Sequence, residues 1–396
     1  MEAILTKIDL NNLDKSTWET FRFEEIAFKI SETVDPNKTD LVIYVGLEHI
    51  DAEDIHIRRR GTPDDVNGQK LKCYPGDVIF GKRRAYQRKA AIANFEGICS
   101  AHAFVFRANS EIIDPKLFPF FLHSDQFMHR MVDISVGGLS PTINWGDLKH
   151  QEFLLPPKAE QARFAELLWA MDDLLQKEKE IYSNFIQYKN SLVDNLLTGK
   201  KRLPGFAKTL NKFSLVEIAN FRRGSFPQPY GLPEWYDDIN GLPFVQVYDI
   251  DFNLKLKNNT KVKISKKATN FSVFVPEGTL IISIQGSIGR VAITQYDAYV
   301  DRTILIFTKY LKETNILFFS YVLQKLFYEK EKSARGAVIK TITKEELSKF
   351  IIPFPEINEQ EKIASEFDEL EKRSNTINNK ILATQSLKKS LINQIF

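Results

Sequence analysis

The chain has 396 residues, of which 43% are hydrophobic and 12% aromatic, enough for two or three folded domains that each have a core. The formal net charge is only +3, so any affinity for nucleic acid has to come from local clusters of basic residues. No apolar run approaches the roughly 18 residues of a membrane span, the N-terminus has no signal-peptide pattern, and Cys73 and Cys99 are too few for a zinc site, so we expect a cytoplasmic protein.

Residues 1–155 are expected to form a first globular domain. The stretches IYVGLEHID (43–51) and YPGDVIF (74–80) are strand-like, and the second of them follows a Pro-Gly turn. Residues 115–131 are expected to be a Phe-rich helix, with Asp114 as its N-cap and Pro115 at its first position. Strands and helices together predict a mixed α/β domain.

The segment KRRAYQRK at residues 82–89 has five basic residues in eight and no acid. Lys and Arg contact phosphates, and Arg and Gln can also bind base edges in the major groove. Its mixture of Arg, Tyr and Gln goes beyond what solubility requires, so the segment is a candidate DNA-contacting site. The candidate residues are Lys82, Arg83, Arg84, Tyr86, Gln87, Arg88 and Lys89. By contrast, the basic run at 58–60 lies beside several acids and is expected to be a surface loop.

Residues 156–198 are predicted to form a long helix. Apolar residues at alternating three- and four-residue spacing make a seam over about five heptads, which is the coiled-coil period. The seam consists of Phe164, Leu168, Met171, Leu175, Tyr182, Phe185, Leu192 and Leu196, and Glu178 and Lys189 interrupt it. A helix of about 38 residues spans on the order of 57 Å, too long for the core of one small domain.

Residues 199–354 are expected to form a second domain that repeats the first weakly. Gly199 and Pro204 supply the stop signals after the helix. The repeated stretches are PFVQVYDID (243–251), VPEGTLIIS (275–283) and a second Phe-rich helix at 314–332. Thr279 stands where the first domain has Asp77, which leaves the shape of that turn open.

The second domain has basic and glycine-rich segments of its own. The stretch 255–267 has six lysines and no acid, and it is either a DNA contact or an ordinary solvated surface. The strand-turn-strand at 280–293 contains Gly-Ser-Ile-Gly at 286–289, either a phosphate- or RNA-facing turn or a bare hairpin turn. The candidate residues here are Arg222, Arg223, Lys261, Lys263, Gln285, Ser287 and Arg290.

Residues 355–396 are predicted to form a second long helix that repeats the first with a shift of 199 positions. Glu160 and Gln161 recur as Glu359 and Gln360, just after a proline in each copy. The second seam consists of Ile363, Phe367, Leu370, Ile377, Ile381, Leu391 and Ile395, interrupted by Ser374, Thr384 and Lys388. If the two seams pair, the second helix has to run back antiparallel to the first.

The fold class is therefore α+β: two similar α/β domains separated by two long helices that pair as an antiparallel coiled coil, in a pseudo-two-fold internal repeat. The expected boundaries are 1–155, 156–198, 199–354 and 355–396. A ligand with its own approximate two-fold symmetry fits such a repeat, and duplex DNA is the obvious one.

Two other function classes compete with DNA recognition. An enzyme within this chain is not indicated, because the sequence has no Asn/Asp-Pro-Pro-Tyr-like tetrad, no glycine loop for S-adenosylmethionine and no histidines at metal-ligand spacing. We therefore predict no catalytic residue and no metal ligand. The remaining alternative is a coiled-coil scaffold or an RNA-binding adaptor without DNA sequence specificity, and the basic clusters at equivalent places in both domains argue against a pure scaffold.

The chain resembles the specificity subunit of Type I restriction-modification systems. The resemblance rests on GGLSPTINWGDLKHQEFLLPPKAEQ (137–161), GAVIKTITKEELSKFIIPFPEINEQ (336–360), the LLTGKKRLPG junction and the Pro-Gly-Asp turn before a strand. It covers the chain from about residue 18 onward, and the duplicated helix start, proline followed by Glu-Gln, is its most specific part.

This resemblance implies two target recognition domains, each recognising half of a bipartite DNA site, and helices that set the spacer. It also implies two modification subunits that bring S-adenosylmethionine, and in most systems restriction subunits that bring ATP and magnesium, with no cofactor in this chain. We expect Glu160, Gln161, Glu359 and Gln360 to face these partner subunits.

Overall fold

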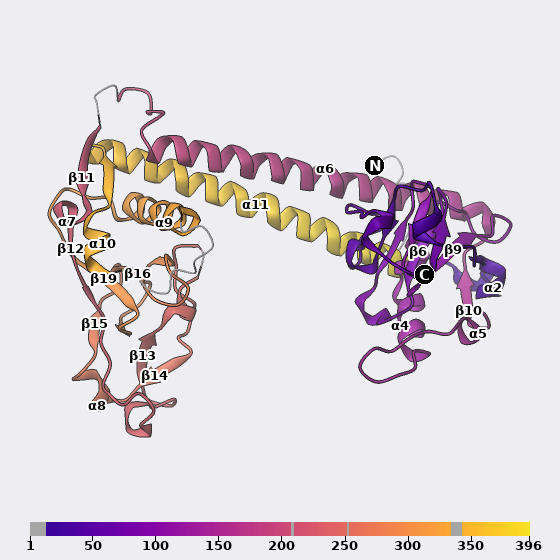
Figure 1. Ribbon diagram of the computed structural model, residues 1–396, viewed down its shortest axis with the longest axis horizontal. Coiled ribbons are helices and arrows are strands. Elements are labelled where there is room, and N and C mark those ends of the chain that lie inside the picture. Colours follow the sequence, from indigo (N-terminus) through magenta and orange to yellow (C-terminus); the bar gives the residue numbers. More distant parts are fainter. Residues whose placement is uncertain (1–12, 207–209, 252, 334–342) are drawn as a thin grey trace. The chain divides into compact units, whose positions relative to one another are not determined.

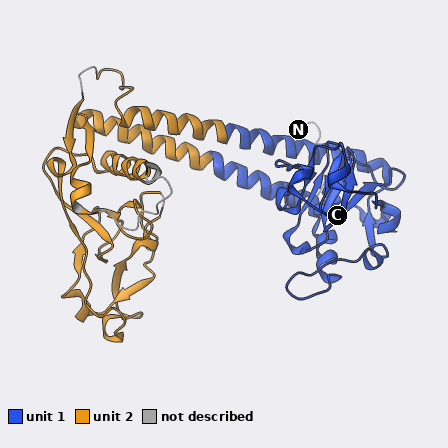
Figure 2. Cartoon of the chain, viewed as in Figure 1, with its two compact units in different colours: residues 1–182, 377–396 blue, residues 183–376 orange. Residues whose placement is uncertain are grey.

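The computed structural model describes residues 13–206, 210–251, 253–333 and 343–396. Its contacts divide the chain into two compact units (Figure 2). The first unit comprises residues up to Tyr182 together with Ile377–Phe396, and the second comprises Ser183–Thr376. The long helices α6 (Lys158–Leu197) and α11 (Ile357–Ile395) each contribute residues to both units. The units thus divide the chain differently from the four segments expected from the sequence, because each helix is shared.

The first unit contains two four-stranded sheets and a short strand pair. One sheet is antiparallel, in the order β2 (Ala27–Ile30), β9 (Ala103–Ala108), β6 (Val78–Gly81), β7 (Ala90–Ile92). The other has the order β3 (Thr33–Val34), β5 (Lys70–Cys73), β8 (Gly97–Cys99), β4 (Tyr44–Val45), and β4 lies parallel to β8. Strands β1 (Glu19–Arg22) and β10 (Glu152–Leu155) pair antiparallel just before α6 begins.

The second unit repeats this plan. Its antiparallel sheet has the order β12 (Ala219–Arg223), β19 (Ile304–Tyr310), β16 (Leu280–Ser283), β17 (Val291–Ile293). Its mixed sheet has the order β14 (Val262–Ile264), β13 (Leu242–Val245), β18 (Ala298–Val300), β15 (Val273–Val275). Strands β11 (Asn211–Ser214) and β20 (Ile351–Phe354) pair antiparallel before α11. The mixed sheets differ at both edges: in the first unit β3 lies outside β5, whereas in the second β14 lies outside β13, the counterpart of β4.

Each unit has further helices, of which α9 (Ile316–Ser333) is the longest (Figure 1). The first has α2 (Phe23–Ile26), α3 (Phe118–His123), α4 (Asp125–Asp133) and α5 (Trp145–Leu148), and the second has α7 (Leu215–Ile218), α8 (Lys266–Thr269), α9 and α10 (Lys344–Ser348). The predicted helix at 314–332 is confirmed as α9. The single helix expected at 115–131 is wrong, because Ser124 breaks it: its backbone is extended, and its buried hydroxyl accepts a hydrogen bond from the Phe127 amide to cap α4.

The turn that contains Thr279 keeps the shape of its counterpart. Gly76 and Gly278 both have a left-handed backbone, with φ of 94° and 82°. Each glycine amide donates to a backbone carbonyl of the following strand segment at 2.8 Å, that of Ala93 in one unit and of Thr294 in the other. Loss of the aspartate therefore does not alter this turn.

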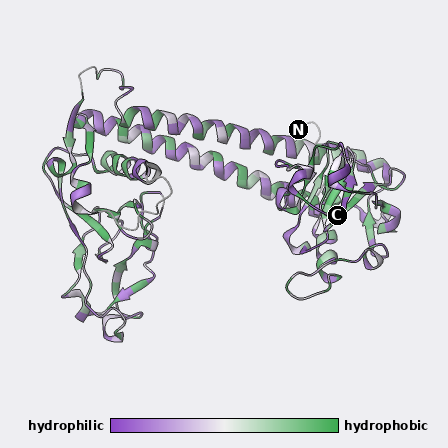
Figure 3. Cartoon of the chain, viewed as in Figure 1, coloured by the Kyte–Doolittle hydropathy of each residue, from purple (hydrophilic) through white to green (hydrophobic). Residues whose placement is uncertain are grey.

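In each unit, α6 and α11 pack against one another and complete the core. The core of the first unit contains Phe164, Leu168 and Met171 of α6, and Leu391 and Ile395 of α11. The core of the second unit contains the residues at the matching positions of the repeat, 199 residues away. These are Ile363, Phe367 and Leu370 of α11 and Leu196 of α6, and Leu192 of α6 packs against them. Figure 3 shows the alternation of hydrophobic and hydrophilic residues along both helices. The ends of the predicted seams thus belong to domain cores.

Charged residues that interrupt the predicted seams make ion pairs between the helices. In the first unit, Lys388 lies 2.5 Å from Asp172, and Lys380 lies 3.3 Å from Glu178. In the second unit, Lys189 lies 2.8 Å from Glu371. Rising residue numbers on α6 meet falling numbers on α11, so the predicted antiparallel pairing is confirmed within each unit.

Candidate nucleic-acid interface

The basic segment at 82–89 forms the turn between β6 and β7. Arg84 and Arg88 have left-handed backbones, with φ of 56° and 52°. The equivalent turn of the second unit, between β16 and β17, has Gly286 and Gly289 with φ of 73° and 82°. A left-handed backbone costs a side-chain-bearing residue about 1–2 kcal/mol. The first unit therefore has arginines at two positions whose backbone glycine adopts more easily.

Arg88 is used inside the unit. Its guanidinium lies 3.2 Å from Glu53 and 2.6 Å from Asp125, and it donates a hydrogen bond to the carbonyl of His123. Lys89 likewise donates to the carbonyl of Leu47 at 2.5 Å. These two candidates fasten the turn to neighbouring elements, so their charges are engaged with intramolecular partners.

The other end of the turn faces solvent. Arg83, Arg84 and Tyr86 are exposed, and Gln87 is half-buried. Arg83 lies 3.4 Å from His102, and Arg84 donates to the hydroxyl of Ser140. This exposed group forms the part of the segment that can meet a phosphate backbone.

Lys82 begins the turn and is half-buried. Its ammonium lies 5.2 Å from the centre of the Phe104 ring. Burial, and then the neighbouring charge of Lys29, lower the pKa of Lys82. The Lys82 side chain thus lies against Phe104 at the start of the turn.

In the second unit, strand register brings two groups of candidates to one end of a sheet. Arg223 of β12 pairs with Leu305 of β19, and Leu305 pairs with Ile282 of β16, directly before the 284–290 turn. Arg222 and Arg223 are both exposed. The turn places Ser287 at the surface and leaves Gln285 half-buried, while Arg290 donates to the carbonyl of Ile250 at 3.2 Å.

The lysine-rich stretch lies on the other sheet of this unit. Lys263 is half-buried on β14, and Lys261 is exposed just before it, with its ammonium 5.2 Å from the centre of the Tyr248 ring. The mixed sheet that carries β14 is separate from the sheet of Arg222 and Arg223. The structure therefore does not join all second-unit candidates into one sheet end.

Three of the four residues expected to face partner subunits are buried. Gln161 donates to the carbonyls of Ile112 and Pro156 and accepts from the amide of Asp114. Gln360 makes the matching set of bonds with Glu313, Pro355 and Asn315.

Glu359 is 1% exposed and paired with Arg202, and only Glu160 remains partly accessible. The repeated Glu-Gln helix start is therefore a clamp that fixes each helix to its own domain. Burial of Gln161, Glu359 and Gln360 corrects their expected placement at a partner surface.

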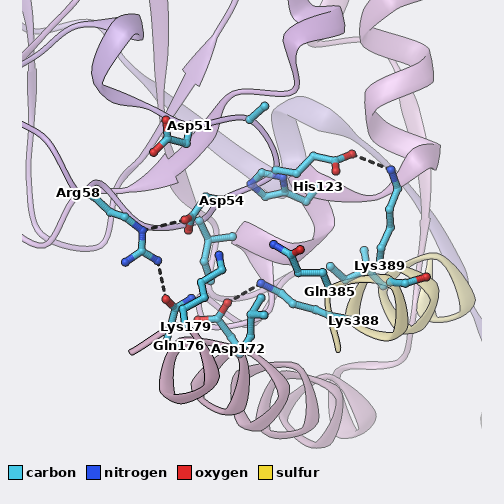
Figure 4. Close-up of a pocket in the computed structure, with 16 residues that line it drawn as sticks. Asp51, Asp54, Arg58, His123, Asp172, Gln176, Lys179, Gln385, Lys388 and Lys389 are labelled. Atoms are coloured by element: carbon cyan, nitrogen blue, oxygen red, sulfur yellow. Dashed lines mark hydrogen bonds and ion pairs between the residues drawn. The ribbon is translucent and has the colours of Figure 1, made fainter. Parts of the chain in front are cut away.

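A polar cavity of about 580 Å³ lies in the first unit where the 51–58 segment meets α6 and α11 (Figure 4). Its charged groups pair across it: Arg58 donates to Asp54 and Gln176, and Lys388 contacts Asp172. Burial alone would raise the pKa of Asp172, but its hydrogen bond with His56 and the charge of Lys388 lower it to about 2. These pairs hold the domain on the helices, and no pattern in the sequence indicates this role for His56, Asp172 or Arg58.

His123 lines the same cavity and predicts a pH effect on stability. Burial lowers its pKa to about 4, and its Nε2–H donates to the carbonyl of Ala90. As the pH falls from about 6.5, the unfolded chain binds a proton that the folded chain refuses, so the free energy of unfolding should drop by roughly 3 kcal/mol by pH 4. Urea unfolding between pH 7.5 and 4.5 measures the free energy of unfolding as a function of pH. Its slope against pH should be smaller in His123→Gln than in wild type, and equal slopes in the two proteins would contradict this prediction.

Metal and membrane features are absent from the part of the chain that the structure describes. There, no group of three or more His, Cys, Asp or Glu residues could hold a metal ion. Among the same residues, no helix is long and apolar enough to cross a membrane.

Comparisons with known proteins agree with this geometry. The profile of the Type I restriction modification DNA specificity domain matches residues 15–183 and again 208–384. A putative type I restriction enzyme specificity subunit of Methanocaldococcus jannaschii is 23% identical over 372 residues, covering 88% of this chain and 85% of that protein. The EcoDI specificity subunit of Escherichia coli is 28% identical over 187 residues, covering 46% of this chain and 41% of that protein.

Solved structures show the same fold. A chain from a study of complex assembly and conformational transition of the type I R-M system superposes with a TM-score of 0.68 at 20% identity, covering 96% of this chain and 97% of that one. The S subunit from M. genitalium gives a TM-score of 0.55 at 14% identity, with 97% and 98% covered. With two matched domains that span most of its length, the chain belongs to the Type I restriction-modification DNA specificity family.

Proposed function

We propose that this specificity subunit recognises a bipartite DNA site, one half with each unit. The observation that carries the proposal is the repeat itself: two copies of the DNA specificity domain, each with a turn between equivalent strands that presents polar side chains and has exposed arginines in it or at the same end of its sheet. The two turns differ in sequence, so the two half-sites should differ. The test is a genome-wide map of methylated adenines in a host carrying this protein and its modification partner. A map without a two-part motif would reject the proposal.

Catalysis belongs to the partners in this proposal. The chain itself acts on no substrate, and the modification subunits bring S-adenosylmethionine while restriction subunits bring ATP and magnesium. The complex acts in the cytoplasm, where the DNA is. The alternative is an RNA-binding adaptor or a scaffold. It predicts that duplex DNA binds the complex no better than RNA does, and a competition binding assay with both nucleic acids distinguishes the two functions.

The exposed arginines of the first turn give a direct test of DNA contact. The double variant Arg83→Ala/Arg84→Ala should weaken DNA binding and reduce the salt dependence of log K by about one per lost phosphate contact. If one of them contacts a base, discrimination at one half-site should fall by about 1–3 kcal/mol. Binding titrations of the assembled complex at several salt concentrations measure both effects.

Arg88→Ala is the matched control for this experiment. Because Arg88 is paired with Glu53 and Asp125, its loss should lower thermal stability and leave the salt slope near wild type. An unchanged salt slope in the double variant would assign the exposed arginines to the solvated surface.

The long helices carry two surface segments of low charge at equivalent positions. On α6, the exposed residues of 183–191 are Ser183, Asn184, Gln187, Tyr188, Asn190 and Ser191. On α11, those of 382–390 are Leu382, Ala383, Gln385, Ser386, Leu387, Lys389 and Ser390, and the one charge, Lys389, is paired with Glu53. Elsewhere α11 exposes many charges, for example Glu366, Asp368 and Arg373. Protein interfaces are depleted of charge at their centre.

These segments are our proposed docking surfaces for the two modification subunits, in place of the buried Glu-Gln clamps. Tyr188 and Leu387 are 199 positions apart, and they are 58% and 52% exposed. Two equivalent surfaces should bind two copies of one partner. The prediction is that wild type binds two modification subunits, Tyr188→Arg or Leu387→Arg binds one, and the double variant binds none.

Native mass measurement of the purified complexes gives these counts. Asp368→Lys, an exposed charge change elsewhere on α11, should still bind two. A stable complex with a single modification subunit for wild type at saturating partner would contradict the duplicated surface.

A further inference from the structure

The segment between α4 and α5 presents an apolar side chain at its tip. Leu139 is 98% exposed, and it follows two glycines, of which Gly137 has φ of 113°. Val136 and Thr142 pair backbone to backbone on either side, at 3.0 and 2.9 Å, so residues 137–141 form a closed tip. In Figure 1 this segment extends away from the body of its domain. The fold itself gains nothing from a leucine at this position, because the side chain contacts almost nothing.

The returning arm of the tip is attached to the basic turn. The Arg84 amide donates to the carbonyl of Pro141 at 2.7 Å, and the Ile143 amide donates to the carbonyl of Lys82 at 2.9 Å. The Arg84 side chain also donates to the Ser140 hydroxyl at 3.0 Å. Three hydrogen bonds therefore join the returning arm of the tip to the basic turn that carries the exposed arginines.

Charge around the tip favours a polyanion as its ligand. Residues 134–146 contain no charged side chain, and the attached turn supplies Arg83 and Arg84 with no acid. A phosphate backbone held by these arginines would face Leu139 from short range. Proteins that deform DNA use apolar side chains in this way, inserting them between neighbouring base pairs next to basic phosphate contacts.

We propose that Leu139 is a DNA wedge that enters the duplex at one base step of the half-site bound by the first unit. The inference rests on the proposed function and adds to it a mode of recognition by deformability: steps that unstack easily are favoured where Leu139 enters. Neither a hydrogen bond nor a base-specific contact is required at that step.

The test places 2-aminopurine at successive positions of the mapped site and measures its fluorescence with the assembled modification complex. Wild type should brighten one step in one half-site, apart from the adenine that is methylated. In Leu139→Ala that signal should disappear and affinity should fall about tenfold, whereas Leu139→Phe should retain both. The signal from the methylated adenine should persist in every variant, because extrusion of a target base is the act of the modifying enzyme.

Ile239→Ala is the control for exposure. Ile239 is 85% exposed but follows Asp237 and Asp238, whose charges repel DNA, so its loss should change neither readout. Leu139→Ala with wild-type fluorescence at every step overturns the wedge, whether or not affinity changes. Failure of the proposed function is a different result: wild type would then show no preference for a bipartite site.

Discussion

A four-residue insertion at matched points in both long helices, near Glu178 and Ile377, should lengthen the recognised spacer by one or two base pairs and leave both half-sites unchanged. Four helical residues add about 6 Å and a net rotation of roughly 40°. One base pair advances about 3.4 Å and turns about 35°. The half-sites should stay the same because the residues proposed to bind them lie in the sheets and turns of the two units. Methylation mapping of the variant measures both the length of the spacer and the sequences of the two half-sites.

An insertion in only one helix is the control. In each unit α6 and α11 pack antiparallel with apolar rows in contact, so a one-sided insertion shifts these rows and should destabilise the chain. The matched insertion preserves the rows. If the matched variant methylates the original spacer, the helices do not set the distance.

Loss of one buried charge should have the largest effect on stability. Lys388→Met leaves Asp172, whose side chain is 1% exposed, without its ammonium partner, and we expect a cost of about 3 kcal/mol. His56 remains as a second partner at 2.5 Å, which is why the lower end of the usual range is expected. Urea unfolding followed by tryptophan fluorescence reports mainly on the first unit, which holds Trp18, Trp145 and Trp169.

The repeat supplies a matched variant. Lys189→Met removes the equivalent lysine of the second unit, but the side chain of Glu371 is 44% exposed, so the cost should stay below about 1 kcal/mol. In the double variant Lys388→Met/Asp172→Asn, stability should recover in part because no unpaired charge is buried. Equal losses for the two lysines would show that burial does not govern this pair.

Periodicity and self-similarity were enough to predict the two long helices and their antiparallel pairing, whereas the family came from the resemblance of the helix starts and the junction after the first helix. The periodicity comes from apolar spacing, which the packing of α6 and α11 directly requires. Burial of polar residues could not be predicted in the same way. Gln161 and Gln360 recur because each satisfies three backbone groups at a helix start, and a repeat alone does not distinguish that role from a shared partner surface.

The basic segment 82–89 shows that sequence alone also does not distinguish an arginine paired inside the domain from an exposed one. Within KRRAYQRK, sequence alone treats Arg83 and Arg88 as equals. Arg88 is drawn inward by Glu53 and Asp125, which lie about 35 residues away in either direction. The position of those acids separates this structural arginine from the exposed ones, because exposed Arg84 has a left-handed backbone as well. Spacing within a short motif carries no information about such distant partners.

The shared core of the first unit has a consequence for synthesis on the ribosome. Leu391, Ile392, Ile395 and Phe396 belong to the same hydrophobic cluster as Phe121 and Phe164, so this unit is closed by residues made about 200 positions after the rest of it. At roughly 5–20 residues per second, its apolar surface waits on the order of 10–40 s for its last helix. The second unit needs no such delay, because all its residues lie between Ser183 and Thr376. The unit that is translated first should therefore be the last to finish folding, and it is the unit that a chaperone would bind in a partly folded state.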